Sequence, residues 1–439
     1  MAGAEVRVLL EVHEGRVAGA LLENRLLDHL TAGGAEVLVV TPGARVPAFA
    51  DRFARPGVWL THLPVHDGLT RPESVLRQLD GRLRRGGRGF GARSGSRFGA
   101  LREALWRADE ALARRRAGAE RALLAAWRPD VVVAAHVRQH YGRRLVAAAH
   151  ERGVATVGNL FSWDNAYRGL STRPRRLTCW SERNRRELEE IWGYPPERVT
   201  AIGAPFFDAY LAPGAAWSRD ELCRRLGLDP GRPILLYASL GQFRMTIDET
   251  SPFEALLRAL DAGAIPGRPQ VVLRLHPTSR SAYFSRFTAR PDVVLSRYEG
   301  YHPGLGWYPS REEMTLAGNL FRHADAAVSP GSTVTLEAAI FDTPTVVPVF
   351  NEYMPEEYER FFSSLWLEQH LRPLVEQRLL VVARDARAMV EAVGRALADP
   401  AAGGAARAAI RRQYLEPLDG RATERFAAVI LAAAREGRA

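Results

Sequence analysis

Residues 323–348 (HADAAVSPGSTVTLEAAIFDTPTVVP) contain the most informative chemistry of the sequence. A buried strand is predicted to end in a turn at Gly331, and a helix is predicted to begin with Ser332 and Thr333. The first amides of a helix lack helical partners and lie at the positive end of its dipole, so this turn predicts an anion site suited to a diphosphate. Glu337, one turn further, can accept hydrogen bonds from ribose hydroxyls. The alternative is a plain helix N-cap that binds no ligand.

A second candidate for phosphate binding is the sequence RLHP at residues 274–277. His276 follows a predicted apolar strand, at the sheet edge where ligands of parallel α/β sheets bind, and its ring can donate to a phosphate oxygen. Without the Ser/Thr turn at residues 332–333, this histidine is better explained as the cap of a strand end. The other residues predicted to contact the phosphate-bearing ligand are Ser239, Gly241, Arg244, Arg274 and Arg280.

The amino-terminal half offers candidates for a general base. His13 and Glu14 directly follow the first predicted strand, where an imidazole or a carboxylate can take a proton from a hydroxyl group. Asp164 lies in the sequence FSWDN, after a later strand, between Trp163 and Asn165. An aromatic face stacks on sugar rings while amides and carboxylates bind hydroxyls, so this neighbourhood favours Asp164 as the base.

Alternatives stay open for these residues. Asp164 is also explained by an Asx turn that closes a tight loop, and the sequence alone does not decide between the three base candidates. His136 ends another predicted strand and is a further candidate for contact with a hydroxyl-bearing substrate, together with Trp163 and Asn165.

Two histidine pairs have the i, i+4 spacing of metal ligands on a helix. They are His62 with His66 and His136 with His140. Neither pair is accompanied by an HExxH glutamate or a nearby third ligand, so we expect no metal site. No cofactor is predicted either.

Alternating strands and helices must position all these groups. In the first half, the predicted strands are 5–12, 36–41, 130–135, 154–158 and one ending at Gly203, and the predicted helices include 17–32, 141–151 and 182–192. In the second half, the predicted strands are 233–239, 271–277, 293–296, 325–330 and 345–350, and the predicted helices include 311–323 and 333–341. This alternation predicts an α/β fold with two Rossmann-like, doubly wound sheets that face a cleft.

Glycines and prolines between residues 203 and 214 interrupt the alternation and predict a domain boundary. We expect a Rossmann-like domain over 1–210, which carries the candidates for contact with a hydroxyl-bearing acceptor, and a Rossmann-like domain over 211–415, which carries the candidates for a phosphate-bearing ligand such as a nucleotide. Residues 416–439 are expected to form a final helix that can pack back on the first domain.

Composition excludes several kinds of catalysis. All 60 basic residues are arginines, because the 439-residue sequence contains no lysine. Phosphate-loop NTPases, protein kinases and Schiff-base enzymes each need a lysine and are therefore excluded. The two cysteines form no disulfide framework, the amino terminus lacks the pattern of a signal peptide, and no run of about 18 apolar residues occurs. We therefore expect a cytoplasmic protein.

The basic charge is concentrated in one stretch, residues 71–121, which holds 14 arginines and 6 acidic residues. Its centre, 82–97, is rich in glycine, serine and arginine and is predicted to be a loop between helices without a packed core. Three interpretations stay open: a solvated insertion, an attachment patch for an anionic membrane surface, and, least favoured, a nucleic-acid site.

The run at 323–348 resembles the nucleotide-binding segment of GT-B glycosyltransferases and their relatives. The matching residues are Gly331, Ser332, Thr333, Glu337, Ala338, Ala339 and Pro344. The His-Pro at 276–277, followed by a Ser/Thr turn, resembles bacterial capsule and lipopolysaccharide transferases and CDP-glycerol glycerophosphotransferase-like enzymes. Segments 193–208, 307–314 and 416–426 are also similar to this superfamily.

The resemblance implies a GT-B glycosyltransferase that moves a sugar from a nucleotide donor to a hydroxyl acceptor in surface glycan or lipid-linked saccharide synthesis. It implies that Ser332 and Thr333 contact donor phosphate, that Glu337 contacts ribose, and that no bound metal is needed. The alternatives are a CDP-glycerol-type glycerophosphotransferase, a nucleotide-sugar 2-epimerase, and a non-catalytic binder of an anionic surface or nucleic acid.

Overall fold

The structure is a computed structural model that describes residues 6–64, 68–85, 99–241, 249–277, 281–330, 333–366 and 371–438. The chain divides into two compact units. Unit 1 comprises residues 1–208, 301–310 and 416–439, and unit 2 comprises residues 209–300 and 311–415.

Unit 1 is built on a seven-stranded parallel sheet with the order β3-β2-β1-β4-β5-β6-β7. Its strands are β1 (Val6–Glu11), β2 (Ala35–Val40), β3 (Val58–Thr61), β4 (Val131–Ala134), β5 (Ala155–Asn159), β6 (Arg176–Cys179) and β7 (Val199–Ala201). The strand order reverses between β1 and β4, and ligands of open parallel sheets bind beyond the carboxyl ends of the strands at such a point.

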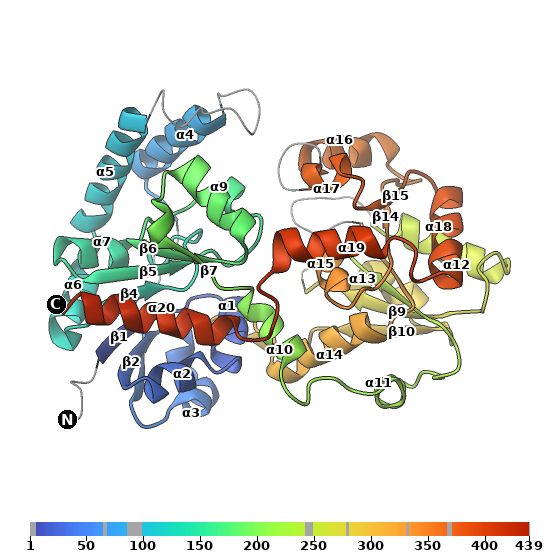
Figure 1. Cartoon of the computed structure of the whole chain (residues 1–439), viewed down its shortest axis with the longest axis horizontal. Coiled ribbons are helices and arrows are strands. Elements are labelled where there is room, and N and C mark those ends of the chain that lie inside the picture. The colour runs from blue at the N-terminus through green and yellow to red at the C-terminus, as the bar shows by residue number, and fades with distance from the viewer. Residues whose placement is uncertain are drawn as a thin grey trace. The chain divides into compact units, whose positions relative to one another are not determined.

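Helices cover this sheet, whose central strands are apolar on both faces, as buried parallel strands are. The carboxy-terminal helix α20 (Ala422–Glu436) packs on α2 (Leu26–Ala32) and across β1, β4 and β5 (Figure 1). The other helices of unit 1 are α1 (Gly15–Ala18), η1 (Gly19–Glu23), η2 (Pro42–Arg45), α3 (Pro47–Phe53), α4 (Arg71–Arg85), α5 (Gly99–Arg115), α6 (Gly118–Trp127), α7 (Arg143–Glu151), α8 (Asn165–Arg168), α9 (Glu182–Trp192), η3 (Pro196–Arg198) and η4 (Pro205–Phe207).

Residues 301–310 lie within the range predicted for the second domain, but they group with unit 1. They form a small antiparallel pair of strands, β11 (Tyr301–His302) and β12 (Gly306–Trp307). The Gly15 amide donates to the Leu305 carbonyl at 2.8 Å, and a Cβ added at Gly15 would lie only 2.1 Å from the Trp307 carbonyl oxygen. Only glycine permits this close approach, which anchors the segment beside the start of α1.

Unit 2 contains a six-stranded parallel sheet with the order β10-β9-β8-β13-β14-β15. Its strands are β8 (Ile234–Ala238), β9 (Gln270–Leu275), β10 (Val293–Arg297), β13 (Ala326–Val328), β14 (Thr345–Pro348) and β15 (Val381–Ala383). Its helices are α11 (Arg219–Leu226), α12 (Ser251–Asp261), α13 (Ser281–Phe284), η5 (Ser285–Phe287), α14 (Arg311–His323), α15 (Thr333–Ile340), α16 (Pro355–Trp366), α17 (Arg372–Glu376), α18 (Ala386–Ala398), α19 (Gly404–Ile410) and η6 (Arg411–Leu415), with α10 (Asp208–Leu211) at the junction of the two units.

The predicted α/β fold with two parallel, doubly wound sheets is confirmed. One predicted helix differs: residues 17–32 form α1, the π-helical turn η1 and α2 in succession. Arg25 adopts a left-handed backbone with φ of 69°, which interrupts the helix at that point. None of the helices in the described ranges combines the length and the hydropathy that a membrane crossing requires.

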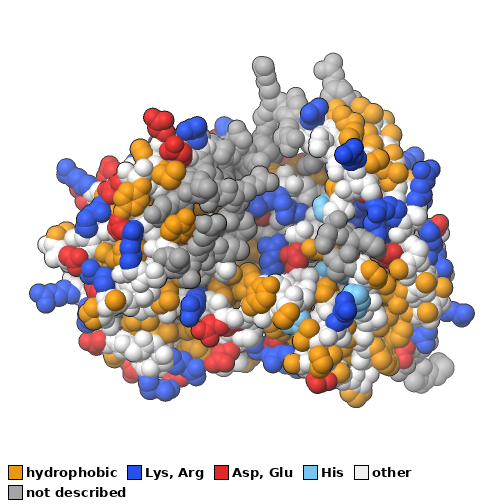
Figure 2. Space-filling view, turned by 180° about the vertical axis from the view of Figure 1, so that it is seen from behind, with side chains coloured by type: hydrophobic (Ala, Val, Ile, Leu, Met, Phe, Trp, Pro, Cys, Tyr) orange, Lys and Arg blue, Asp and Glu red, His pale blue; other side chains and the backbone are white. Residues whose placement is uncertain are grey.

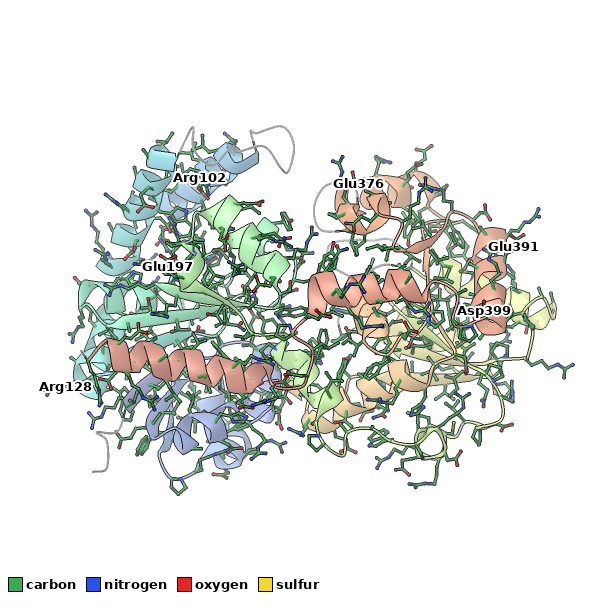
Figure 3. The ribbon with its side chains drawn as sticks, viewed as in Figure 1. Arg102, Arg128, Glu197, Glu376, Glu391 and Asp399 are labelled. Atoms are coloured by element: carbon green, nitrogen blue, oxygen red, sulfur yellow. The ribbon has the colours of Figure 1, made fainter. Side chains whose placement is uncertain are left out.

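Helices α4 and α5 and the beginning of α6 carry the described part of the arginine-rich stretch, whereas residues 86–98 lie outside the described residues. Arg102 on α5, labelled in Figure 3, pairs with Asp80 on α4 at 2.9 Å and lies 5.9 Å from the Trp192 ring. Acidic partners are likewise paired with Arg77, Arg107, Arg114 and Arg121. Figure 2 shows basic and acidic side chains interspersed on the face that it displays.

A buried ion-pair cluster joins α4 and α5 to α7. Arg143 lies 2.5 Å from Glu73 and 2.7 Å from Asp109, and all three residues are buried. Burial raises the pKa of Glu73, but the hydrogen bonds from Arg143 and Thr70 outweigh it and lower that pKa to about 2. The cluster therefore depends on an ionised Glu73.

Candidate active site

At the carboxyl end of β1, the carboxylate of Glu11 contacts the imidazole of His13. Glu11 is buried, and its Oε1 lies 2.5 Å from Nδ1 of His13. The His13 ring stacks on Tyr141, with centroids 5.0 Å apart and planes 11° from parallel. Because an ionised carboxylate only accepts hydrogen bonds, Nδ1 of the ring donates to Glu11, and Nε2 is the ring nitrogen that can take a substrate proton.

A hydrogen-bonded chain crosses the carboxyl ends of β1, β4 and β5. Arg16 donates to Glu14 at 2.8 Å, and Glu14 lies 3.3 Å from Nδ1 of His136. Nε2 of His136 lies 3.1 Å from Oδ1 of Asn165, whose amide nitrogen donates to Asp164 at 3.2 Å. The sheet therefore assembles four predicted site residues from three distant segments of the sequence.

Glu14 is held in its ionised form. Burial alone would raise its pKa, but the hydrogen bond with His136 and the charges of His136 and Arg16 lower that pKa to about 2. A carboxylate with so low a pKa is a weak proton acceptor near neutral pH. Its contacts favour a role in orienting His136 over a role as general base.

Both carboxylate oxygens of Asp164 also have partners. Its Oδ1 accepts from Ser162 at 2.7 Å as well as from Asn165, and its Oδ2 pairs with Arg168 at 2.6 Å. Asp164 precedes the short helix α8 without a side-chain cap hydrogen bond to it. These three donors occupy both oxygens, so the contacts favour His13 over Asp164 as the base.

Trp163 is enclosed by the protein, with 3% of its surface exposed. Its backbone carbonyl accepts from the Asn184 side chain at 2.8 Å, which ties the loop to α9. The predicted stacking of Trp163 on a sugar ring stays a prediction that this burial does not favour.

In unit 2, Arg274 lies near the carboxyl end of β9, in register with Ala238 of β8 and Ser296 of β10. It is 6% exposed, and its guanidinium carbon lies 3.7 Å from the centre of the Tyr298 ring. Nη1 donates to Ser296 at 2.7 Å, but within the described residues Nε and Nη2 are buried without a hydrogen-bond partner. Leaving such donors unpaired costs about 1–3 kcal/mol each, so both donors are available to a further hydrogen-bond acceptor.

Glu337, on α15, accepts a hydrogen bond of 2.6 Å from the hydroxyl of Tyr210. Burial raises the pKa of Glu337, while the Tyr210 hydrogen bond and the charge of Arg274 act in the opposite direction. Burial and the negative charge of Glu337 also raise the pKa of Tyr210. Tyr210 therefore stays a donor and holds one carboxylate oxygen of Glu337 in place.

The backbone of the loop after β8 already contacts an acidic side chain of unit 2, that of Glu249. The Ser239 hydroxyl accepts from the His276 amide at 2.8 Å, which fixes the end of β9 to the end of β8. The amides of Leu240 and Gly241 both donate to Glu249, at 2.7 and 3.3 Å. Gly241 has a φ of 81°, which glycine adopts without strain, and its predicted contact with a donor phosphate stays a prediction.

Five residues that the sequence analysis singled out lie outside the residues that the structure describes, namely Gly331, Ser332, Arg244, Arg280 and His66. Thr333 begins α15, and a buried strand, β13, precedes it as predicted. Within the described ranges, no group of three His, Cys, Asp or Glu side chains is arranged to hold a metal ion.

Two residues that contact the candidate site residues, Glu11 and Tyr210, were not predicted from the sequence. Glu11 is an acid inside an otherwise apolar strand, two positions before a histidine, and that pattern was a usable signal. Tyr210 gave no such signal, because its partner Glu337 lies 127 positions further along the chain.

No protein-family model matches the chain, and no curated protein matches it by sequence. Solved structures match it over nearly its full length. A Listeria monocytogenes protein assigned as a UDP-N-acetylglucosamine 2-epimerase superposes with a TM-score of 0.58 at 14% identity, covering 99% of this chain and 98% of that chain.

Two further structures match to a similar degree. The UDP-GlcNAc 2-epimerase of Neisseria meningitidis, bound to UDP-GlcNAc, has a TM-score of 0.56 at 11% identity, covering 97% of this chain and all of that one (100%). A Rickettsia africae glycosyltransferase has a TM-score of 0.53 at 11% identity, covering 97% of this chain and 99% of that chain. The two parallel sheets are therefore those of the two-domain GT-B fold.

Proposed function

We propose that this protein is an enzyme that acts on a nucleotide-activated sugar, with the nucleotide bound by unit 2. The observation that carries the proposal is the buried Arg274 guanidinium, whose Nε and Nη2 have no partner in the described part of the chain. A diphosphate would satisfy both donors through charge-assisted hydrogen bonds. Glu337, fixed by Tyr210, would accept hydrogen bonds from ribose hydroxyls.

We propose glycosyl transfer as the reaction and His13 as its base. Nε2 of His13 takes the proton from an acceptor hydroxyl, and the hydroxyl oxygen forms a bond to the anomeric carbon of the donor sugar. The bond from that carbon to the diphosphate breaks, and the nucleoside diphosphate leaves with the electron pair. Glu11 stabilises the imidazolium that forms on His13, because its carboxylate lies 2.5 Å from Nδ1. A cytoplasmic location and an acceptor in surface glycan or lipid-linked saccharide synthesis belong to the same proposal.

A 2-epimerase is the second candidate, because the structures that resemble this chain include several UDP-GlcNAc 2-epimerases. An epimerase inverts the configuration at C2 of the sugar and needs no acceptor. A transferase releases nucleoside diphosphate and needs an acceptor hydroxyl. Incubation with UDP-GlcNAc alone, followed by NMR spectroscopy of the sugar, therefore separates the two reactions.

The nucleotide proposal is tested by thermal shift with UDP, CDP, CMP, GDP and ADP, since a ligand that binds only the folded state raises its melting temperature. We expect at least one nucleotide to stabilise the protein, and Arg274→Gln to remove most of that effect. Arg297→Gln, an exposed arginine on the neighbouring strand β10, is the matched control and should leave it unchanged. Stabilisation by none of the nucleotides would contradict the proposal.

A further inference from the structure

A pocket of unit 1 opens beside the Glu11–His13 pair. Its cavity volume is about 30 Å³, or about 540 Å³ when all the space out to the open solvent at its mouth is counted, and its wall includes His13, Tyr141, Leu63, Glu120, His140 and Arg144. Trp163, Asp164 and Asn165 are not among the residues of its wall. The pocket therefore gives His13 a neighbourhood different from the one expected around residues 161–165.

Arg144 is the unusual residue of this pocket. It is 8% exposed and belongs to the first turn of α7, where free amides favour anions. Within the described residues, its guanidinium makes no hydrogen bond or ion pair. The adjacent Arg143, in contrast, is paired with Glu73 and Asp109. Arg144 is therefore a largely buried arginine that no hydrogen bond or ion pair among the described residues offsets, although the charges of Glu120 and Glu73 attract it.

The pocket offers further unused hydrogen-bonding groups. Oε2 of Glu120 and Nδ1 of His140 are both buried without a hydrogen-bond partner in the described part of the chain. Burial and the charges of nearby arginines lower the pKa of His140 to about 4, so its ring is neutral at neutral pH. The pocket lining thus includes the guanidinium of Arg144, the carboxylate of Glu120 and the neutral imidazole of His140.

We propose that this pocket is the acceptor site and that it binds an anionic saccharide, with the acid group on Arg144 and a hydroxyl group on Glu120. An arginine fork binds a carboxylate or a phosphate, and a carboxylate accepts from a sugar hydroxyl. The identity of the pocket as an acceptor site rests on the proposed transfer reaction. The selectivity for an anionic sugar rests on Arg144 alone and can be tested without turnover.

The probes are glucuronate, glucose 6-phosphate and glucose, which share a sugar ring and differ in their acid group. Calorimetry should show that wild-type protein binds one or both of the acidic sugars more tightly than glucose. The preferred probe distinguishes a carboxylate ligand from a phosphate ligand. Arg144→Gln should weaken that binding by at least about tenfold, as expected for loss of a charge-assisted hydrogen bond. Arg115→Gln, an exposed arginine at the end of α5, is the control and should bind like wild type.

The melting temperature of the unliganded protein provides a second readout. Arg144→Gln should melt at the same temperature as wild type or higher, because it removes a largely buried charge that no hydrogen bond or ion pair of the described residues offsets. If Arg144→Gln does not fold, Arg144 has a structural role and the proposal is overturned. Arg144→Lys keeps the charge but loses the fork, and an intermediate affinity for the preferred probe is expected of it.

Equal affinity of wild type for glucose and for the acidic sugars would overturn the proposal, as would unchanged binding in Arg144→Gln. The nucleotide thermal shift, measured on the same variants, should not change. A protein that binds UDP but no acidic sugar contradicts only the pocket assignment. A protein that binds an acidic sugar through Arg144 but no nucleotide retains the anionic-sugar site and contradicts the proposed enzyme.

Discussion

The Glu11 carboxylate lies 2.5 Å from Nδ1 of His13, at the carboxyl end of the first strand of unit 1. The pair is two residues apart, so a single turn of backbone after β1 suffices to bring the groups together. Stacking on Tyr141 fixes the plane of the imidazole. This contact leaves Nε2 as the ring nitrogen that can accept a proton, which is why we propose His13 as the base.

His13→Gln should lower turnover by at least about 100-fold, the low end for loss of a positioned base. Glu11→Gln should lower it less, because the imidazole remains but loses the anion that stabilises its charged form. Steady-state rates with a saturating donor check both variants. His29→Gln on α2 is the control and should keep normal turnover. Normal turnover in His13→Gln would return the assignment to Asp164 or Glu14.

Asp164→Asn separates a base from a structural carboxylate. Because both oxygens of Asp164 already have donors, we expect turnover to fall less than about tenfold and the melting temperature to fall, since the pair with Arg168 is lost. Kinetics and thermal unfolding of the same variant are compared. A loss of about 100-fold or more in turnover at an unchanged melting temperature would support the assignment of Asp164 as the base from its sequence neighbourhood.

Glu337→Gln should weaken binding of a nucleoside diphosphate by about 1–3 kcal/mol, because the charged acceptor for ribose is lost while the size is kept. The affinity for pyrophosphate, which has no ribose, should not change when it is measured by competition. His276→Ala should weaken both ligands, because its predicted partner is the phosphate. Calorimetry with both ligands measures the four affinities. Equal weakening of both ligands by Glu337→Gln would make that residue structural.

Acid should weaken unit 1 through Glu73. Its pKa in the folded protein is about 2, below the ordinary value of 4.5, so its contribution to stability is present above pH 4.5 and is lost as the pH falls towards 2. Glu73→Gln should lower the free energy of unfolding at pH 7 by about 3–5 kcal/mol, the cost of breaking a buried pair.

Urea unfolding of wild type and Glu73→Gln at pH 7 and pH 3 measures this effect, and the difference between them should shrink at pH 3. Glu103→Gln, at an exposed pair with Arg107, should change stability by no more than about 1 kcal/mol. A difference between wild type and Glu73→Gln that does not depend on pH would contradict the assignment of an ionised Glu73.

Attachment of the arginine-rich stretch to an anionic membrane stays a prediction. Binding to vesicles that contain anionic lipid should be strong at low salt and fall steeply as salt rises, since the attraction is screened within about 8 Å at physiological salt. It should disappear when serine replaces Arg82, Arg84, Arg85, Arg88, Arg93 and Arg97. The matched control replaces six exposed arginines of unit 2, namely Arg224, Arg268, Arg297, Arg378, Arg387 and Arg395. Stronger binding to an oligonucleotide at the same ionic strength would favour nucleic acid, and binding to neither would leave a solvated insertion.

Most of the sheet elements could be predicted because their signals are local. The apolar runs at 5–12, 36–41, 130–135 and 271–277 coincide with β1, β2, β4 and β9 to within two residues. The strands that were not predicted are β3, β6, β11, β12 and β15, which have two to four residues each. Strands that short carry little periodicity, although β7 and β13, with three residues each, lie in longer apolar runs and were predicted.

The candidate site was predicted only in part, for a related reason. His13, Glu14 and His136 were expected at the sheet edge because each follows a strand, and the carboxyl ends of parallel strands share one edge. Which of them contact one another depends on the strand order: β4 lies beside β1, so His136 reaches Glu14 across 122 positions of sequence.

The sequence by itself determined the α/β class, the two parallel sheets and the strand ends that carry polar residues, because hydrophobic periodicity is written in consecutive residues. Only the tertiary structure decided that Arg274 is buried with two donors that no described residue pairs, that Tyr210 holds Glu337, and that residues 301–310 belong to unit 1. Burial and pairing of this kind arise from strand register and helix packing between segments distant in the chain. No local pattern of residue types specifies those contacts.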